Sequence, residues 1–292
     1  MDLSICIPTR NARNFLAQCL DSIPAHPPKL DYEIIVVDIG SSDGTAEWLA
    51  EAWPQVRLIR LEGNQGFTKP MNLAFAAAQG DYLLALNSDT LLKEDAFTPQ
   101  VQYLREHPNV GICIPKILNR DGSLQVQSRM GEPKPLAVIG YHLKLGSLFK
   151  RSQALNAYRM PWLKEDEIAE VDAVSGSCMF ISRAAYQATG GFDEAFFAYQ
   201  EDSDICLRAR QAGFKIMYLP ISSVYHYAGE GGSQDQPYKQ IYEWHRSYFT
   251  FYRKHYAKSR FFLFNWGYYL LMSGKLALAM LKQLLKFKKP SS

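Results

Sequence analysis

The sequence predicts an α/β protein with a mostly parallel, doubly wound sheet, and two observations carry this prediction. Short apolar runs alternate with amphipathic stretches over the first 115 residues, which is typical of successive βαβ units. Two of the apolar runs end in polar groups, one at Asp38 and one at Asn87-Ser88-Asp89. Because ligands of such sheets bind at the carboxyl ends of the strands, these residues mark the expected site.

The elements of the first half follow one another at short intervals. Strands are expected at residues 3–8, 33–38, 56–61 and 82–86, with helical patterns at 12–23 and 69–79. Residues 41–45, Ser-Ser-Asp-Gly-Thr, form a turn with a helix start behind it.

The second half is less regular. Residues 116–170 contain three prolines and mixed charge, and we expect a long excursion over the sheet. The later elements are an apolar run at 171–183 broken by Ser-Gly-Ser at 175–177, a helix at 205–212 opened by the acids at 201–204, and a strand at 215–219 followed by His226.

The C-terminal segment combines aromatic and basic residues. Residues 261–272 carry no charge, but this run is shorter than the ~20 residues of a spanning helix. Lysines 275, 282, 286 and 289 fall on one helical face, and Leu276, Met280, Leu284 and Phe287 fall on the other. The pattern favours a basic amphipathic helix lying on a membrane surface. A helix packed on the domain is the alternative.

The charge of the chain is unevenly placed. The formal net charge is +3, but the ten Lys and Arg residues after Glu243 are accompanied by no acid. Residues 1–243 hold the other 22 basic residues and all 29 acidic ones, a balance of −7. This asymmetry indicates an anionic partner for the tail. Because the lysines alternate with long apolar runs, a membrane fits better than nucleic acid.

Cysteine usage and the first residues bear on the compartment. The five cysteines form no C-x-x-C pair and no metal-binding spacing, so we expect buried, reduced thiols in a cytosolic protein. The first residues have no basic region and no long apolar run, and they are interpreted as a strand rather than a signal peptide.

A few polar residues could carry chemistry. Asp89 follows a strand and could hold a divalent cation beside a diphosphate, although it could also cap a helix. Glu201 and Asp202 stand at a helix start, which favours acids, but a carboxylate here could also act as a general base. His226, beside a glycine-rich stretch, could ligate a metal or a phosphate, or be structural.

Eight motifs occur in an order that resembles the family 2 glycosyltransferases of the GT-A fold, over residues 3 to 233. They are Ser-Ile-Cys-Ile-Pro-Thr-Arg-Asn at 4–11, Val-Val-Asp-Ile-Gly-Ser-Ser-Asp-Gly-Thr at 36–45, Asn-Gln-Gly-Phe at 64–67 with Asn72, Leu-Asn-Ser-Asp-Thr at 86–90, Gly-Ser-Cys-Met-Phe-Ile at 176–181, Gly-Gly-Phe-Asp-Glu at 190–194, Glu-Asp-Ser-Asp-Ile-Cys-Leu-Arg at 201–208, and His226.

The resemblance implies a role for each group. Asp202 would be the general base, with Glu201 beside it. Asp89 and His226 would hold Mg²⁺ or Mn²⁺, and Gly176 and Met179 would contact the acceptor. The nucleotide sugar would be bound by Pro8, Thr9, Arg10, Asp38, Ser41, Asn64, Gly66, Asn72, Asn87 and Ser88.

The resemblance also divides the chain. It implies a GT-A catalytic domain over residues 1–240, with a nucleotide-sugar half at about 1–115 and an acceptor half at about 116–240. A basic, aromatic helical tail over 241–292 follows it and is expected to associate with a membrane.

Three positions depart from the family pattern. Ile39 stands where many relatives have Asn, Asn87 where many have Asp, and Met71 where many have Arg. An amide at 87 is a weaker metal ligand than a carboxylate. An Asn-x-Asp sequence is common in rhamnosyltransferase-like members, which points to a deoxysugar donor such as dTDP-rhamnose.

The expected function is therefore that of an inverting, metal-dependent glycosyltransferase. It would extend a lipid-linked glycan for a surface polysaccharide, on the cytoplasmic face of the cell membrane. One alternative is a sugar-phosphate nucleotidyltransferase, although the loop after the first strand has no glycine. Another is a catalytically silent protein that binds a nucleotide sugar or a membrane.

Overall fold

The computed structural model describes residues 1–230 and 236–287. Lys289 of the expected basic face lies outside the described residues, as do the side chains of Lys286 and Phe287. The strands are β1 (Leu3–Thr9), β2 (Tyr32–Ile39), β3 (Arg57–Leu61), β4 (Tyr82–Leu86), β5 (Thr90–Leu91), β6 (Val110–Leu118), β7 (Arg129–Met130), β8 (Ala169–Glu170), β9 (Ala173–Val174), β10 (Cys178–Ser182) and β11 (Lys215–His226).

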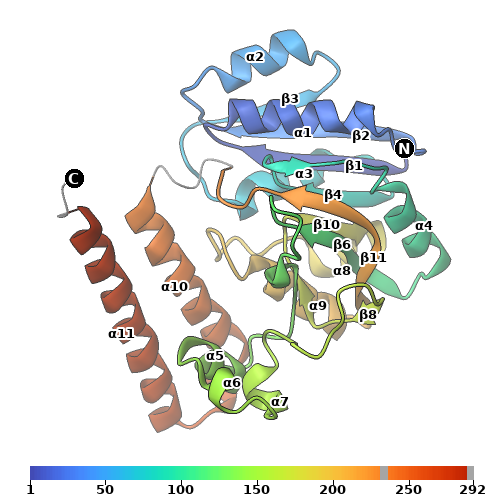
Figure 1. The fold of residues 1–292 in the computed structure, drawn as a ribbon. Coiled ribbons are helices and arrows are strands. Elements are labelled where there is room, and N and C mark those ends of the chain that lie inside the picture. The colour runs from blue at the N-terminus through green and yellow to red at the C-terminus, as the bar shows by residue number, and fades with distance from the viewer. Residues whose placement is uncertain (231–235, 288–292) are drawn as a thin grey trace.

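Helices pack around a central sheet, and two long helices near the C-terminus stand to one side of it (Figure 1). The helices are α1 (Arg13–Ala25), α2 (Thr45–Ala52), α3 (Thr68–Ala77), α4 (Thr98–Glu106), α5 (Pro135–His142), α6 (Leu145–Leu148), α7 (Gln153–Asn156), α8 (Arg183–Thr189), α9 (Glu201–Gln211), α10 (Pro237–His255) and α11 (Phe262–Phe287).

The sheet confirms the predicted fold class. Its order is β3-β2-β1-β4-β10-β6-β11-β5, with β8 paired to β11. The pairs β1–β2, β1–β4, β2–β3 and β6–β11 are parallel, whereas β10 runs antiparallel to both of its neighbours. Strands buried on both faces are rich in apolar residues, as in β1, in which every residue is buried and the only hydroxyl side chains are Ser4 and Thr9.

The expected elements of the first half are all present, with bounds shifted by a few residues at most. The second half differs in more places: the short helices α5–α7 and helix α8 were not expected, and α9 begins at Glu201 rather than at residue 205. Two strands differ as well. Strand β6 runs to Leu118, past the point where the irregular excursion was expected to begin. Strand β11 is 12 residues long and contains His226 as its last residue, because it continues past the apolar stretch at 215–219. Alternating buried and exposed residues in its second part were not recognised in the sequence.

Helix α10 packs on helix α9 through a buried ion cluster. The carboxylate of Asp204, which has no exposed surface, accepts hydrogen bonds from Arg208 Nε at 2.7 Å, Lys254 Nζ at 2.6 Å and His255 Nε2 at 2.7 Å. Tyr248, Phe251 and Tyr252 of α10 are also buried. The first half of the expected tail is thus held against the sheet domain.

Helix α11 packs on α10 with one face and leaves the other in solvent. The Tyr268 ring stacks on the Tyr252 ring at 3.9 Å between centroids, and Met272 is fully buried. On the outer face Trp266 is 63% exposed and Leu270 is 68% exposed. None of the helices in the described part of the chain combines the length and hydropathy that crossing a bilayer requires.

The five cysteines are all buried and unpaired. Burial raises the pKa of the Cys19 and Cys206 thiols to about 12. Such thiols are poorly reactive, and they serve as small apolar residues in the core.

Candidate active site

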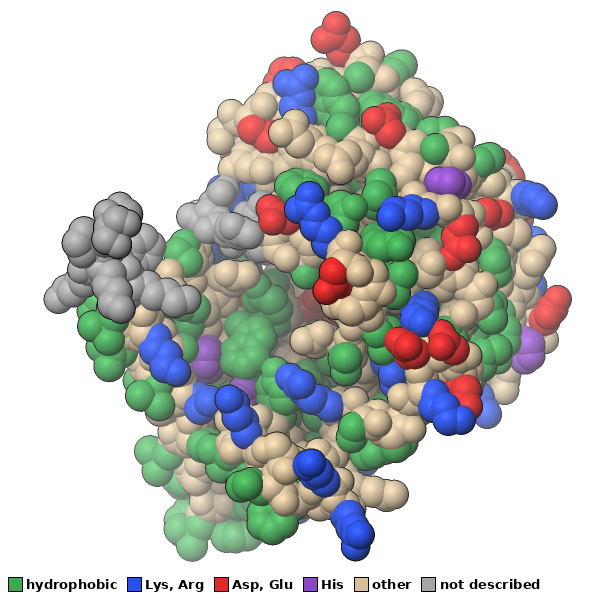
Figure 2. Space-filling view, viewed as in Figure 1, with side chains coloured by type: hydrophobic (Ala, Val, Ile, Leu, Met, Phe, Trp, Pro, Cys, Tyr) green, Lys and Arg blue, Asp and Glu red, His purple; other side chains and the backbone are tan. Residues whose placement is uncertain are grey.

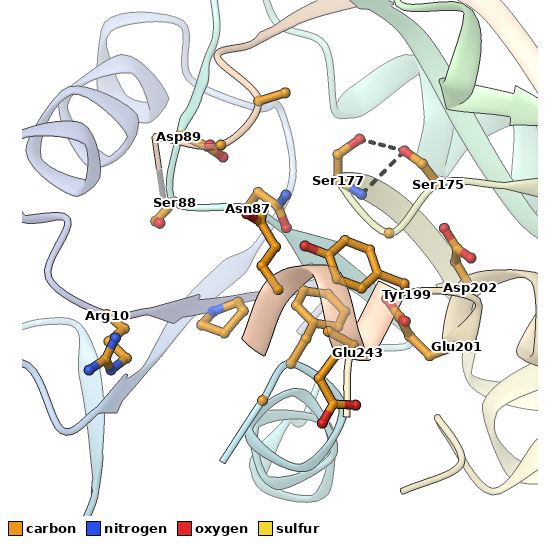
Figure 3. Close-up of a pocket in the computed structure, with 18 of the residues that line it drawn as sticks. Arg10, Asn87, Ser88, Asp89, Ser175, Ser177, Tyr199, Glu201, Asp202 and Glu243 are labelled. Atoms are coloured by element: carbon orange, nitrogen blue, oxygen red, sulfur yellow. Dashed lines mark hydrogen bonds between the residues drawn. The ribbon is translucent and has the colours of Figure 1, made fainter. Parts of the chain in front are cut away.

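A cavity of about 720 Å³ opens at the carboxyl ends of the parallel strands, as the doubly wound sheet predicts. Residues from both halves of the sheet domain and from α10 line it. In Figure 3, Ser88 and Asp89 come from one side, Glu201 and Asp202 come from the other, and Asn87 lies between them. The motifs at the ends of β4 and at the start of α9 therefore meet across one cavity.

The ends of β1 and β2 supply two unsatisfied oxygen atoms, one on Thr9 in the cavity lining and one on Asp38 in the adjacent strand. Thr9 and Asp38 are neighbours in the parallel register. Both are buried, and Thr9 Oγ1 and Asp38 Oδ1 have no hydrogen-bond partner among the described residues. Buried oxygen atoms are normally hydrogen-bonded, so these two atoms are suited to accept bonds from a ligand.

Gly66 allows the loop before α3 to touch the segment before α9. It has a φ of +83°, and a Cβ at this position would lie 2.2 Å from the carbonyl oxygen of Phe197. The backbone N–H of Phe67 donates to that same oxygen at 2.8 Å. Asn64 holds the turn, since its Oδ1 accepts from the N–H of Gly66 at 3.1 Å. Only glycine fits this approach.

Asp89 and His226 meet at the ends of β4 and β11. His226 Nε2 lies 3.2 Å from Asp89 Oδ1 and 3.1 Å from Asn87 Nδ2. All three residues line the cavity, and Asp89 and His226 are buried. Strand β5, which follows Asp89 directly, pairs with the end of β11 and so brings the two side chains together.

Gln125, which the sequence analysis did not identify, orients the His226 ring. Its Oε1 lies 2.7 Å from His226 Nδ1, and its Nε2 donates to Asn119 Oδ1 at 3.2 Å. With Oε1 as the acceptor, Nδ1 carries the proton and Nε2 keeps its lone pair toward Asp89. This is the arrangement found for metal-ligating histidines, whose other ring nitrogen is fixed by a neighbouring group. Gln125 lies 101 residues before His226 in the chain, and no sequence motif indicates that the two side chains meet.

These residues fit a divalent cation that takes its other ligands from a bound substrate. Among the described residues no group of three or more His, Cys, Asp or Glu side chains could hold a metal ion. Asp89 and His226 Nε2 supply oxygen and imidazole donors, which suit Mn²⁺, whereas Mg²⁺ prefers oxygen ligands. Asn87 now turns its Nδ2 toward His226 Nε2 and would have to present its amide oxygen to join them. Such a cation would be held weakly until phosphate oxygens completed its shell.

The two carboxylates at the start of α9 differ in their surroundings. Burial raises the pKa of Asp202 to about 6, although its carboxylate accepts hydrogen bonds from the N–H of Ser203 at 2.6 Å and from the N–H of Gly176. Burial and the neighbouring Asp202 raise the pKa of Glu201 well above its usual range. Glu201 Oε2 has no partner among the described residues. Of the two carboxyl groups, Asp202 thus gives up its proton more readily.

A strained turn aims these carboxylates into the cavity. Tyr199 and Gln200 have φ values of 68° and 61°, which are unfavourable for side-chain-bearing residues. Gln200 Nε2 donates to Tyr158 Oη at 2.9 Å, and Tyr158 Oη lies 3.1 Å from Tyr248 Oη on α10. The Tyr199 hydroxyl is hydrogen-bonded to Gln240, also on α10. Contacts with α10 therefore hold the turn in place.

Most of the residues expected at the site line this cavity. They are Pro8, Thr9, Arg10, Asn64, Gly66, Asn87, Ser88, Asp89, Gly176, Glu201, Asp202 and His226. Residues that line it without having been expected include Gln125, Tyr199, Lys239 and Glu243. The last two come from α10, for which the sequence offered no site motif.

Four expected residues lie outside the cavity lining. Asp38 stands behind Thr9, and the Ser41 hydroxyl accepts from the N–H of Asn11 at 2.9 Å. Asn72 uses its amide to hold the loop before α9, with bonds of 2.8 Å and 2.9 Å to the backbone of Phe192. Met179 is fully buried within β10.

Comparison with known proteins identifies a family and related enzymes. A family model described as glycosyl transferase family 2 matches residues 4–166. The N-acetylglucosaminyl-diphospho-decaprenol L-rhamnosyltransferase of Mycobacterium tuberculosis is 28% identical over 229 residues, which are 75% of this chain and 73% of that protein.

Two solved structures share the fold. TarS of S. aureus aligns with a TM-score of 0.56 and 19% identity over 82% of this chain, and the chain spans only 38% of it. The mannosyltransferase PcManGT of Pyrobaculum calidifontis, solved with GDP-Man and Mn²⁺, aligns with a TM-score of 0.56 and 18% identity. That alignment covers 86% of this chain and 64% of PcManGT.

Proposed function

The chain belongs to glycosyl transferase family 2, and from this premise we propose that it transfers a sugar from a nucleoside-diphosphate sugar to a lipid-linked glycan, with inversion at the anomeric carbon. The observation that carries the proposal is one cavity with Asp202 on one side and Asp89 on the other, where Asp89 contacts His226. Family membership favours this function over a sugar-phosphate nucleotidyltransferase.

Asp202 would act as the base. The acceptor hydroxyl gives its proton to the Asp202 carboxylate while its oxygen attacks the anomeric carbon. The bond from that carbon to the diphosphate oxygen breaks on the opposite side, and the nucleoside diphosphate leaves with the electron pair. A base of this kind is most effective when its pKa lies near the working pH, and burial brings the Asp202 pKa to about 6.

Asp89, His226 and Asn87 would hold a divalent cation against the diphosphate of the donor. When bound, the cation neutralises the charge that develops on the leaving group. Thr9 and Asp38 would accept hydrogen bonds from the nucleoside through their unpartnered oxygen atoms, and the Arg10 side chain lies in the same cavity wall.

The donor we favour is dTDP-rhamnose. The support is the Asn87-Ser88-Asp89 sequence at the cation position and the relative from Mycobacterium tuberculosis, which is named as an L-rhamnosyltransferase. That relative's name also specifies a lipid-linked diphosphate sugar as its acceptor, and we infer an acceptor of the same class here.

The tail would bring the cavity to such an acceptor. The outer face of α11 exposes Phe262, Trp266 and Leu270, and the ten Lys and Arg residues after Glu243 have no acidic neighbour in sequence. An apolar helix face next to basic side chains suits the surface of an anionic bilayer. We place the protein on the inner face of the cell membrane, without a spanning segment among the described residues.

A donor screen tests the reaction. The purified protein is incubated with each nucleotide sugar, Mn²⁺ or Mg²⁺ and a polyprenyl-diphosphate sugar acceptor, and the released nucleoside diphosphate is measured. We expect release from dTDP-rhamnose, with loss of the signal on chelation and in Asp202→Asn.

The controls separate the parts of the proposal. Release from another donor overturns the sugar assignment but keeps the reaction. Equal release by Asp202→Asn contradicts the base assignment. Silence with all donors and acceptors, from a protein that still unfolds cooperatively, overturns the proposed function.

A further inference from the structure

A second segment of the chain shares the composition of the tail. Residues 133–164 contain six Lys and Arg residues and no acid, the nearest acids being Glu132 and Glu165. The segment forms the short helices α5, α6 and α7 and the loop after them. It lies within the sheet domain in sequence, about 100 residues before α11, so the tail does not account for it.

This segment places large apolar side chains in solvent. Leu148 is 74% exposed and Phe149 is 58% exposed, at the end of α6. Lys144, Lys150 and Arg151 beside them are exposed as well. Single exposed apolar residues are ordinary, but adjoining ones within a basic segment indicate an interaction surface.

The two segments adjoin in the fold. Lys275 Nζ of α11 donates to the carbonyl oxygen of His142, the last residue of α5, at 3.2 Å. The His142 ring packs against the ring of Trp244 on α10, at 5.3 Å between centroids. Figure 1 shows α5–α7 beside the lower ends of α10 and α11.

Charge and apolar side chains gather on the same side of the molecule. Figure 2 shows hydrophobic and Lys or Arg side chains over α5–α7 and α11, with no Asp or Glu visible there among the described residues. On α11 the exposed apolar side chains continue from Trp266 and Leu270 to Leu278, Leu281 and Leu285.

We infer that Leu148, Phe149, Lys150 and Arg151 form, together with the outer face of α11, one two-part surface that docks on an anionic lipid bilayer. The apolar side chains enter the headgroup region, and the basic ones contact anionic headgroups. The inference extends the membrane attachment in the proposed function, on which it rests, from the tail to an internal segment.

The charge of the internal segment can be tested by flotation of the full chain. Vesicles of phosphatidylglycerol and phosphatidylcholine in equal parts are compared with vesicles of phosphatidylcholine alone. Lys150→Glu/Arg151→Glu should lower the partition coefficient on the anionic vesicles by about tenfold, since both basic side chains leave an anionic surface. The matched control is Lys29→Glu/Lys215→Glu, which makes the same charge change at exposed positions before β2 and at the start of β11, and it should bind within about twofold of the wild type.

The depth of the apolar residues can be tested with a fluorescent reporter. Phe149→Trp adds an indole directly after α6, and Trp266 reports on α11 in the same full chain. Lipids brominated on their acyl chains should quench the fluorescence of both indoles. The signal of the added indole is the difference between Phe149→Trp and wild type. The signal of Trp266 is the difference between wild type and Trp266→Phe.

Each outcome bears on a different claim. Quenching at position 266 without quenching at 149, or equal binding by Lys150→Glu/Arg151→Glu and its control, overturns the two-part surface and leaves attachment through the tail. Absence of binding by the wild-type chain overturns both. Neither outcome affects the glycosyl transfer reaction, which the donor screen measures without a bilayer.

Discussion

Asp202 and Glu201 are adjacent in sequence, but burial raises the pKa of Glu201 well above its usual range and that of Asp202 only to about 6. Backbone N–H groups donate to the Asp202 carboxylate, whereas Glu201 Oε2 lies buried without a partner among the described residues. Two neighbouring carboxylates with different pKa values divide acid and base roles between them. Asp202 ionises more readily than Glu201, and it is therefore the group that we propose takes the proton from the acceptor.

The pair makes a matched test of that division. Asp202→Asn should lower kcat by about 10²–10⁴-fold, the usual contribution of a general base. Glu201→Gln should keep kcat within about tenfold, because glutamine has the charge and shape of the protonated acid. The measurement is steady-state release of nucleoside diphosphate. A loss in Glu201→Gln as large as that in Asp202→Asn would show that Glu201 acts in its ionised form.

The pH dependence follows from the pKa of the base. Asp202 must be deprotonated to accept a proton, and burial raises its pKa to about 6. The value of kcat/KM should therefore be level above pH 6 to 7 and fall tenfold per pH unit below about 6. A profile measured with Mn²⁺ held saturating, still level at pH 5, would contradict this base.

Gln125 should matter for cation binding through the tautomer of His226. Gln125→Leu removes the acceptor at 2.7 Å from Nδ1, and Mn²⁺ affinity in the presence of nucleoside diphosphate should fall by about 10–100-fold. Isothermal titration calorimetry measures this without turnover. Gln125→Glu keeps an acceptor and should retain the affinity.

Gln127 provides the control for that measurement. It also lines the cavity, but its side chain is exposed. Gln127→Leu should bind Mn²⁺ within about twofold of the wild type, since no ligand depends on it. Equal affinities in Gln125→Leu and Gln127→Leu would contradict the orienting role.

Helix α10 supports helix α9, which carries the proposed base Asp202. Asp204 ties it to α9, and Gln240 and Tyr248 support the strained turn that precedes Glu201. The helix also forms part of the cavity wall. We therefore expect a substitution in α10 that breaks these contacts to shift the position of Asp202.

The Asp204 cluster should be important for stability. Asp204→Asn removes the negative charge that Arg208, Lys254 and His255 surround. The free energy of unfolding should fall by about 3 kcal/mol, which is the usual effect of breaking a buried ion pair. Asp193→Asn breaks only the half-exposed bridge to Lys254 and should cost less than about 1 kcal/mol. Urea unfolding at pH 7 measures both.

The same cluster gives this stability a pH dependence. Burial opposes ionisation of Asp204, but the hydrogen bond from His255 and the charges of Arg208 and Lys254 hold its pKa below the usual 3.8. The stabilisation is present above that value and is lost as the pH falls below it. The difference in the free energy of unfolding between wild type and Asp204→Asn should therefore become smaller at low pH. A difference that stayed constant down to pH 2 would argue against an ionic origin of this stabilisation.

Elements that have their own hydrophobic pattern can be predicted from the sequence. Elements whose position depends on contacts with residues far away in the chain cannot. Strand β4 was predicted with its observed bounds because its apolar run is uninterrupted and Asn87 follows it. Helix α10 has an irregular mixture of aromatic and basic residues, and its contacts with α9 are formed by tertiary structure alone. The same reason explains why Gln125, Lys239 and Glu243 were missed in the site.

The division of charge along the chain predicts how the proposed attachment to a membrane responds to salt. The basic tail and the acidic remainder differ in sign, and screening shortens the reach of surface charges from ~10 Å at 0.1 M salt to ~3 Å at 1 M. Binding to anionic vesicles should fall several-fold over that range, with a remainder due to the apolar side chains. Binding that does not change with salt would show that charge contributes nothing.

The link between α5 and α11 has a geometric consequence. Helix α11 has 26 residues and is therefore about 39 Å long. A cylinder resting on a plane can still roll about its own axis, so the tail by itself leaves the docked enzyme one rotation. The hydrogen bond from Lys275 to His142 fixes a second contact beside that axis. Contacts that do not lie on one line would stop the roll, and the mouth of the cavity would then keep one height and one tilt above the lipids that we propose carry its acceptor.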